Sequence, residues 1–192
     1  MNNNSSNEKN ITVYCASSPD APARFTDLAR ELGRLAALAG YGTVTGAGTT
    51  GLMGAVVDGT LSVSGGRAVG VIPQFMVDRG WANPLMTELH VTPDMAARKQ
   101  SLADLGCAAV ALPGGVGTLD ELMDLLARCQ LGLYTRPVVI LNADGFYDNL
   151  LAQLDHADAC SMMRHLGADD TPLWHVARTP AEAIAIIDGA AR

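Results

Sequence analysis

Residues 112–121 read LPGGVGTLDE, and this stretch decides the predicted fold. The apolar run just before it, residues 107–112, is typical of a buried strand, and Pro113 ends that strand because proline has no N–H to donate. The residues after it recur at helical spacing: Leu119, Leu122, Met123, Leu126 and Cys129. The glycines therefore lie in a strand-to-helix turn, where backbone amides approach a ligand closely and a helix N-terminus favours phosphate.

Thr118 and Glu121 leave a second interpretation of the same stretch open. They form a Thr-x-x-Glu pattern, which is typical of a capping box at the start of a helix. Glu121 would then satisfy the backbone of its own helix and have no ligand.

A second glycine turn, residues 46–51 (GAGTTG), stands between an expected strand and an expected helix. Its Gly-x-Gly-x-x-Gly spacing matches a dinucleotide fingerprint. An NAD site also expects an acidic residue about 20 positions later, at the end of the next strand. Residues 60–73 contain none, so an NAD(P) oxidoreductase is disfavoured. Close strand–helix packing and a second anion-contacting loop both remain open, with Gly46 and Gly48 as candidate contacts.

Strand and helix patterns alternate along the whole chain, which predicts an α/β fold with an open parallel sheet and helices on both faces. After a polar tail at residues 1–10, a single Rossmann-like domain is expected over residues 11–192. Residues 74–86 show no regular pattern, and a flexible flap is one interpretation of them. The expected strands are 11–15, 41–45, 68–72, 89–91, 107–112, 138–141 and 173–176. The expected helices are 22–39, 52–63, one opening at Thr92-Pro93, one running to about residue 131, 147–159 and 180–188.

Composition excludes several classes of protein. The net charge is −7 without any basic run, which argues against a nucleic acid polymer as partner. No apolar run reaches the length of a membrane span, and the first ten residues do not resemble a signal peptide. The four cysteines are widely separated, as expected for reduced thiols in a cytoplasmic protein, and no metal-ligand spacing is present.

Residues 94–99 (DMAARK) place Asp94 and Arg98 on one face of the expected helix. They either form an exposed ion pair within the helix or leave Arg98 free to bind a carboxylate or phosphate. Ser17, in the turn after the first strand, is either a turn residue or a hydroxyl contact to a ligand.

In order and spacing, GAGTTGLMG (46–54), DMAARK (94–99) and PGGVGTLDE (113–121) resemble the LONELY GUY (LOG) family of cytokinin-activating phosphoribohydrolases, often labelled possible lysine decarboxylases. The resemblance runs from the first strand to about residue 150. It implies a Rossmann-like fold, usually dimeric, that hydrolyses the N-glycosidic bond of nucleoside 5′-monophosphates. AMP or N6-substituted AMP would give the free base and ribose 5-phosphate, without a cofactor or metal.

The resemblance also implies the site residues. Arg98 and Glu121 match the catalytic pair. The expected substrate contacts are Gly114, Gly115, Val116, Gly117, Thr118, Lys99, Asp120, Met95, Gly46, Gly48 and Ser17. Several positions depart from the family pattern: Val116 stands where many members have tyrosine, Asp120 where many have glutamate, and Ala127 where a polar residue is frequent. Residues 74–89 also lack an acidic pattern, which leaves the preferred base open.

The residue types suit this chemistry. A carboxylate can stabilise the positive charge that develops on the sugar, or accept a proton from water. Glu121 is expected in the first turn of its helix, where the dipole favours the ionised form. The proton donor to the leaving base stays open between Asp120 and water. A pyridoxal phosphate enzyme is disfavoured, because the only lysines are Lys9 in the tail and Lys99.

The helix after Glu121 is apolar around much of its circumference, so a homodimer through this helix is expected. The alternative function is a carrier that binds a nucleotide or molybdenum cofactor without catalysis.

Overall fold

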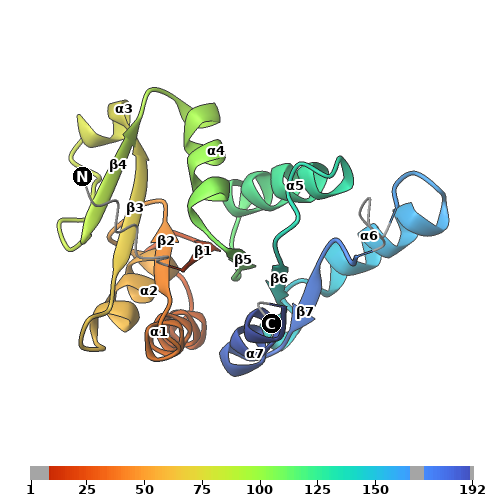
Figure 1. Cartoon of the computed structure of the whole chain (residues 1–192), viewed down its shortest axis with the longest axis horizontal. Coiled ribbons are helices and arrows are strands. Elements are labelled where there is room, and N and C mark those ends of the chain that lie inside the picture. Colours follow the sequence, from red (N-terminus) through yellow and green to blue (C-terminus); the bar gives the residue numbers. More distant parts are fainter. Residues whose placement is uncertain (1–8, 165–170, 191–192) are drawn as a thin grey trace, which may run out of the picture.

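The computed structural model describes residues 9–164 and 171–190, in which seven strands form one fully parallel sheet (Figure 1). The predicted α/β class and open parallel sheet are confirmed. Most of the predicted tail, residues 1–8, lies outside the described residues, but its last residue, Asn10, is buried in the first strand. The strands are β1 (Asn10–Tyr14), β2 (Gly42–Thr45), β3 (Ala68–Pro73), β4 (Glu88–Thr92), β5 (Ala108–Ala111), β6 (Val138–Leu141) and β7 (His175–Ala177).

The strand order is β4-β3-β2-β1-β5-β6-β7. The chain starts in the middle of the sheet at β1, builds outward to β4, and then returns to place β5 on the other side of β1. The direction of building therefore reverses between β1 and β5. In open α/β sheets, ligands bind outside the carboxyl ends of the strands at such a switch point.

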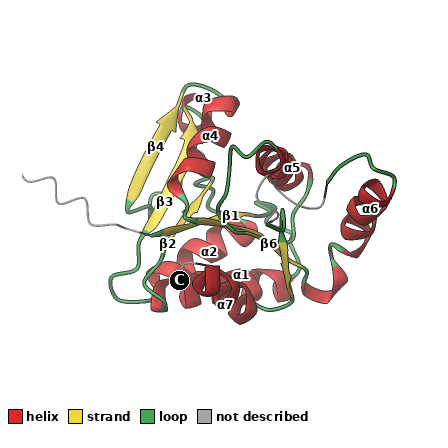
Figure 2. Ribbon diagram, turned by 45° about the vertical axis from the view of Figure 1, so that its right-hand side comes forward, coloured by secondary structure: helices red, strands yellow, loops and turns green. Residues whose placement is uncertain are grey.

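Helices cover both faces of the sheet, as predicted. In Figure 2, α1, α2 and α7 lie on one face, and α4 and α5 lie on the other. The helices are α1 (Ala23–Leu38), α2 (Gly51–Leu61), α3 (Gln74–Val77), α4 (Met95–Leu105), α5 (Val116–Gln130), α6 (Asp148–Ala159) and α7 (Pro180–Ala190).

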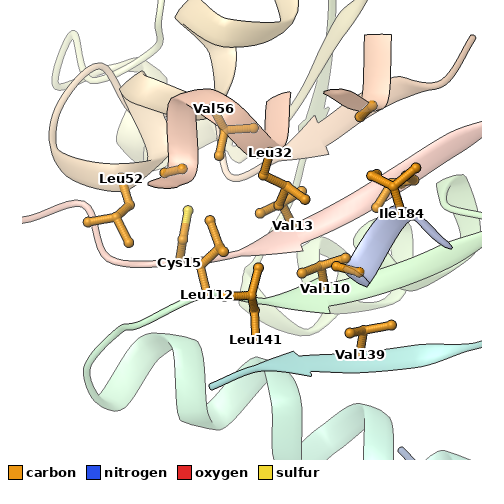
Figure 3. Packing of buried hydrophobic residues seen from close by; sticks show 14 of the residues in the cluster. Val13, Cys15, Leu32, Leu52, Val56, Val110, Leu112, Val139, Leu141 and Ile184 are labelled. Carbon is orange, nitrogen blue, oxygen red and sulfur yellow. The ribbon is translucent and has the colours of Figure 1, made fainter. Parts of the chain in front are cut away.

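Two buried apolar clusters, one on each face, hold these layers together. On the first face, alternate residues of β1, β5 and β6 point toward α1, α2 and α7, as the side chains of Val13, Val110, Leu32 and Val56 show (Figure 3). The intervening residues of the same strands pack on the opposite face against α4 and α5. Strands buried on both sides explain the continuous apolar runs in the sequence.

Three local predictions were wrong in detail. The segment expected to be irregular contains the short helix α3. Helix α4 does not open at Thr92-Pro93: its N-cap is Asp94, whose carboxylate accepts a hydrogen bond from the Ala97 amide at 2.8 Å. This cap also removes the predicted alternative of an ion pair between Asp94 and Arg98. Helix α5 begins at Val116, which puts its start before Thr118 and prevents the predicted capping box.

Helix α4 is anchored at its other end as well. The guanidinium of Arg136, in the segment before β6, donates to the carbonyls of Ala103 and Asp104 at 3.1 and 2.9 Å. These are among the carbonyls that a helix C-terminus leaves without partners. Capped at both ends, α4 forms a fixed support for the side chains that it carries toward the carboxyl edge of the sheet.

Candidate active site

A cavity of about 740 Å³ opens at the carboxyl edge of the sheet, beside the switch point between β1 and β5. Its wall is built from the turns after β1, β2 and β3, from residues near the N-termini of α2 and α4, and from the first two turns of α5. Among the predicted site residues, the cavity brings together Ser17, Gly46, Gly48, Met95, Arg98, Gly115, Gly117, Thr118 and Glu121. Residues from four separate sequence segments therefore meet at the place where this type of sheet binds ligands.

A buried ion pair between Arg98 and Glu121 lies in the wall of the cavity. Nη1 of Arg98 donates to Oε1 of Glu121 at 2.8 Å, and each side chain is only 9% exposed. Nε of Arg98 also donates to the carbonyl oxygen of Val71, near the end of β3, at 3.2 Å. A buried charge is tolerated only when it is paired and hydrogen-bonded. The pair is therefore fixed in orientation and still borders the space available to a ligand.

Gly46 is required by this arrangement. A Cβ atom at position 46 would overlap the Arg98 guanidinium, so a larger residue would displace it. The first glycine of GAGTTG thus makes room for a side chain from another helix. Gly46 also lines the cavity, so its part in the ion pair and its predicted part in ligand contact are compatible.

The sequence predicted that the dipole of α5 favours the ionised form of Glu121, and this prediction was wrong. Glu121 lies in the second turn of α5, so it is beyond the helix end where the dipole would favour ionisation. Burial raises the pKa of the Glu121 carboxyl above its ordinary value, and the nearby Arg98 opposes that rise. A carboxylate with a raised pKa accepts a proton more readily than an exposed glutamate.

The glycine loop supplies amides at the other side of the cavity. Gly115 is the N-cap of α5 and makes no side-chain cap hydrogen bond, so the first amides of the helix are available to a ligand. Gly115, Gly117 and Thr118 line the cavity. Gly114 lies beneath them, where a Cβ atom would overlap the Thr118 side chain. Gly114 thus supports the loop without facing the cavity.

The turn after β2 also contributes polar groups. The Thr50 hydroxyl donates to the Ser17 carbonyl oxygen at 2.6 Å and so joins the turns after β1 and β2. Ser17, Thr49 and Thr50 all line the cavity, close to the N-terminus of α2. The sequence alone gave no reason to select Thr49 or Thr50 over other turn residues.

Three other predicted contacts lie outside the cavity lining. Nζ of Lys99 pairs with the Asp120 carboxylate at 2.9 Å, and this hydrogen bond raises the pKa of Lys99. Val116 is 85% exposed and is absent from the cavity lining.

Among the cavity residues that were missed from the sequence, two belong to one segment. Trp81 and Met76 come from the segment interpreted as a flexible flap, yet both line the cavity. That segment is tied to the turn after β2, since the amide of Asn83 donates to the Ala47 carbonyl oxygen at 2.8 Å and its side chain donates to the Gly48 carbonyl oxygen at 3.3 Å. The tryptophan in this irregular stretch was the one sequence signal of a role in ligand contact.

Cys15 also lines the cavity but is not a nucleophile. Burial raises the pKa of its thiol, and the nearby Glu121 carboxylate adds to that rise. The thiol is therefore neutral, and the reactive form of cysteine is the thiolate.

The fold and the cavity together define a Rossmann-like protein with a glycine loop and a buried arginine–glutamate pair in the lining of one cavity. The family model described as "Possible lysine decarboxylase" matches residues 53–187, and the chain belongs to that family.

Curated relatives carry a more specific name. The cytokinin riboside 5′-monophosphate phosphoribohydrolase of Rhodococcoides fascians is 41% identical over 150 residues, which cover 78% of this chain and 75% of the relative. The phosphoribohydrolase LOG of Oryza sativa is 38% identical over 149 residues, covering 78% of this chain and 61% of the relative. The chain thus spans about three-fifths of the length of this rice relative.

Solved structures share the fold at lower identity. A molybdenum cofactor binding protein from Rippkaea orientalis superposes with a TM-score of 0.72 at 22% identity, covering 97% of this chain and 100% of the other. The molybdenum cofactor carrier protein of Chlamydomonas reinhardtii gives 0.70 at 25% identity, covering 96% and 98%.

The family description does not fit the lysines of this chain. A lysine decarboxylase that uses pyridoxal phosphate needs a lysine amine for a Schiff base. Lys99 is held in its charged form by Asp120 outside the cavity lining, and Lys9 is exposed before β1.

Within residues 9–164 and 171–190, no helix is long and apolar enough to cross a membrane.

Proposed function

We propose that this chain hydrolyses the N-glycosidic bond of nucleoside 5′-monophosphates, such as AMP or an N6-substituted AMP. One water molecule is consumed, and the products are the free base and ribose 5-phosphate. The observation that carries the proposal is the buried pair of Arg98 and Glu121 in a cavity that also includes the N-terminus of α5. The names of the curated relatives support the same reaction.

The phosphate binds at the first turn of α5. The amides of Gly115, Gly117 and Thr118 have no partners within the helix, and the helix dipole adds a partial positive charge there. Backbone amides and a dipole suffice to hold a phosphate group. Ser17 and Thr50 line the same cavity and add hydroxyl groups to it.

Glu121 acts on the sugar. As the bond to the base breaks, positive charge develops on the sugar ring, and a nearby carboxylate stabilises that charge. The same carboxylate accepts a proton from the attacking water, for which its raised pKa is suited. Arg98 holds the carboxylate in position through its hydrogen bond and remains charged throughout.

A phosphate requirement tests the proposal. Purified chain is incubated with AMP, with N6-substituted AMP and with adenosine, and free base is measured by chromatography. Base release is expected from both nucleotides, and much more slowly from adenosine, which lacks the group bound by α5. Equal rates with adenosine would contradict the phosphate site. Nucleotide binding without any base release would favour the alternative function, a carrier without catalysis.

The same proposal includes a homodimer that forms through α5 and the segment after it. Leu131 and Leu133 follow α5, and both side chains are exposed large apolar groups. Exposed apolar side chains beside a functional helix are typical of a protein contact. Light scattering should give twice the 20.0 kDa mass of the chain, and Leu131→Lys with Leu133→Lys should give the monomer.

We also place the protein in the cytoplasm, since all four cysteines are free thiols.

A further inference from the structure

The cavity has an apolar end that the glycine loop does not reach. Its wall there is formed by side chains without hydrogen-bonding groups on their surface: Ile72, Met76, Met95 and the ring face of Trp81. The polar side chains of the lining come from the turns after β1 and β2, from α4 and from α5: Ser17, Ser18, Thr49, Thr50, Arg98, Thr118 and Glu121. Within the described residues that line the cavity, those of β3 and the segment after it thus contribute no polar side chain other than the indole.

The two ends are separated by the sheet itself. Met76 and Trp81 follow β3, whereas Gly115 and Gly117 follow β5, and β2 and β1 lie between these strands. Three strand spacings of about 4.8 Å put the two ends about 14 Å apart. Arg98 spans the middle, since its guanidinium lies against Gly46 at the end of β2 and reaches Glu121 on α5. A nucleotide with its phosphate at α5 and its sugar beside Glu121 therefore has its base at the β3 end.

Trp81 is held in place although its side chain is 51% exposed. Its backbone amide donates to the Met76 carbonyl oxygen at 3.1 Å, which fixes it against α3. The Arg79 guanidinium lies 5.1 Å from the centre of the Trp81 ring and 5.4 Å from that of Phe75, so one cation is shared by two aromatic faces. Such contacts are favourable and restrict the indole orientation. The exposed indole is thus an ordered surface at the mouth of the cavity.

We propose that Trp81, together with Met76 and Met95, is the surface on which the base of the nucleotide stacks. This inference rests on the proposed function, because it takes the orientation of the nucleotide from it. An aromatic ring stacks on any flat base, and methionine side chains adapt to irregular apolar groups. This part of the cavity thus accepts a flat base, and an apolar substituent on the exocyclic nitrogen of a purine adds contact with the two methionines.

The kinetic test compares Trp81→Ala with Trp81→Phe, which keeps an aromatic face. Stacking of a base on an aromatic side chain corresponds to a loss of roughly 5- to 150-fold on substitution by alanine. We expect Trp81→Ala to lower kcat/KM for AMP by that factor, and Trp81→Phe to stay within a few-fold of wild type. Inhibition by ribose 5-phosphate, which has no base, should be unchanged in both variants.

A binding test keeps the inference separate from catalysis. The chain has two tryptophans, and Trp174→Phe leaves Trp81 as the only one. AMP should change the fluorescence of that variant, and ribose 5-phosphate should change it much less. Unchanged kcat/KM for AMP in Trp81→Ala, or an equal loss of ribose 5-phosphate binding, would overturn the role of Trp81. Failure of wild type to release base, with the fluorescence response intact, would instead overturn the proposed reaction and leave the stacking surface standing.

Discussion

Replacing Arg98 by methionine tests how much the buried ion pair of Arg98 and Glu121 contributes to the stability of the fold. Arg98→Met keeps much of the side-chain packing but removes the donor to Glu121 at 2.8 Å and the donor to the Val71 carbonyl oxygen at 3.2 Å. Glu121 is then a buried carboxyl group without its cation. Breaking a buried pair from one side costs about 3–5 kcal/mol, so a loss of that size in the free energy of unfolding is expected at pH 8.

The loss in the free energy of unfolding should depend on pH, and the surroundings of Glu121 determine whether it grows or shrinks as the pH rises. Burial already raises the pKa of Glu121, and Arg98 is the main influence against that rise. Without Arg98 the folded-state pKa rises further. A carboxyl group whose pKa is higher in the folded than in the unfolded chain stabilises the fold below its ordinary pKa of 4.5, and this stabilisation disappears as the pH rises through the folded-state pKa. The destabilisation by Arg98→Met should therefore be small at pH 5 and grow toward pH 8.

Urea unfolding of wild type and variant at pH 5, 6, 7 and 8 measures this difference. Adding Glu121→Gln to Arg98→Met should restore part of the lost stability at pH 8, because the uncompensated charge is gone. Arg34→Met is the matched control, since its ion pair with Glu31 lies exposed on α1 and should matter little at any pH. A loss below about 1 kcal/mol at pH 8, or a loss that does not change with pH, would refute the reasoning.

Three further outcomes follow from the same geometry. Gly46→Ala should lower kcat/KM for AMP, because the added Cβ displaces the Arg98 guanidinium; steady-state kinetics with unchanged circular dichroism would show this. Asp94→Ala should cost about 1 kcal/mol of unfolding free energy through loss of the α4 cap, with wild-type stability counting against that cap. The kcat/KM for AMP should fall at acid pH with an apparent pKa above the ordinary 4.5 of a glutamate, because catalysis needs the ionised form of Glu121; an activity unaffected down to pH 4 would argue against that role.

The fold followed from local patterns. Alternating strand and helix signals predicted the parallel sheet, and the two glycine turns predicted where its ligand edge lies. Element ends were less predictable, because they depend on which residue caps a helix. Asp94, and not Thr92, caps α4, while Gly115 starts α5 early enough to carry Glu121 into the core.

The site depended on contacts that no local pattern records. Arg98 and Glu121 are 23 residues apart, and only the return of the chain from β4 to β5 brings α4 beside α5. The resemblance to a known family selected both residues, but their shared burial and the raised pKa of Glu121 come from the packing of the two helices. Trp81 escaped selection because its segment has no periodicity, although Asn83 fixes that segment to the turn after β2.

The most direct measurement is the rate of adenine release from AMP by wild type, Glu121→Gln and Glu31→Gln, together with AMP binding by the same three proteins. Catalysis by the Glu121 carboxylate predicts release by wild type and by Glu31→Gln, and a loss of at least about 100-fold in Glu121→Gln while AMP still binds. Release by Glu121→Gln at the wild-type rate would contradict the account.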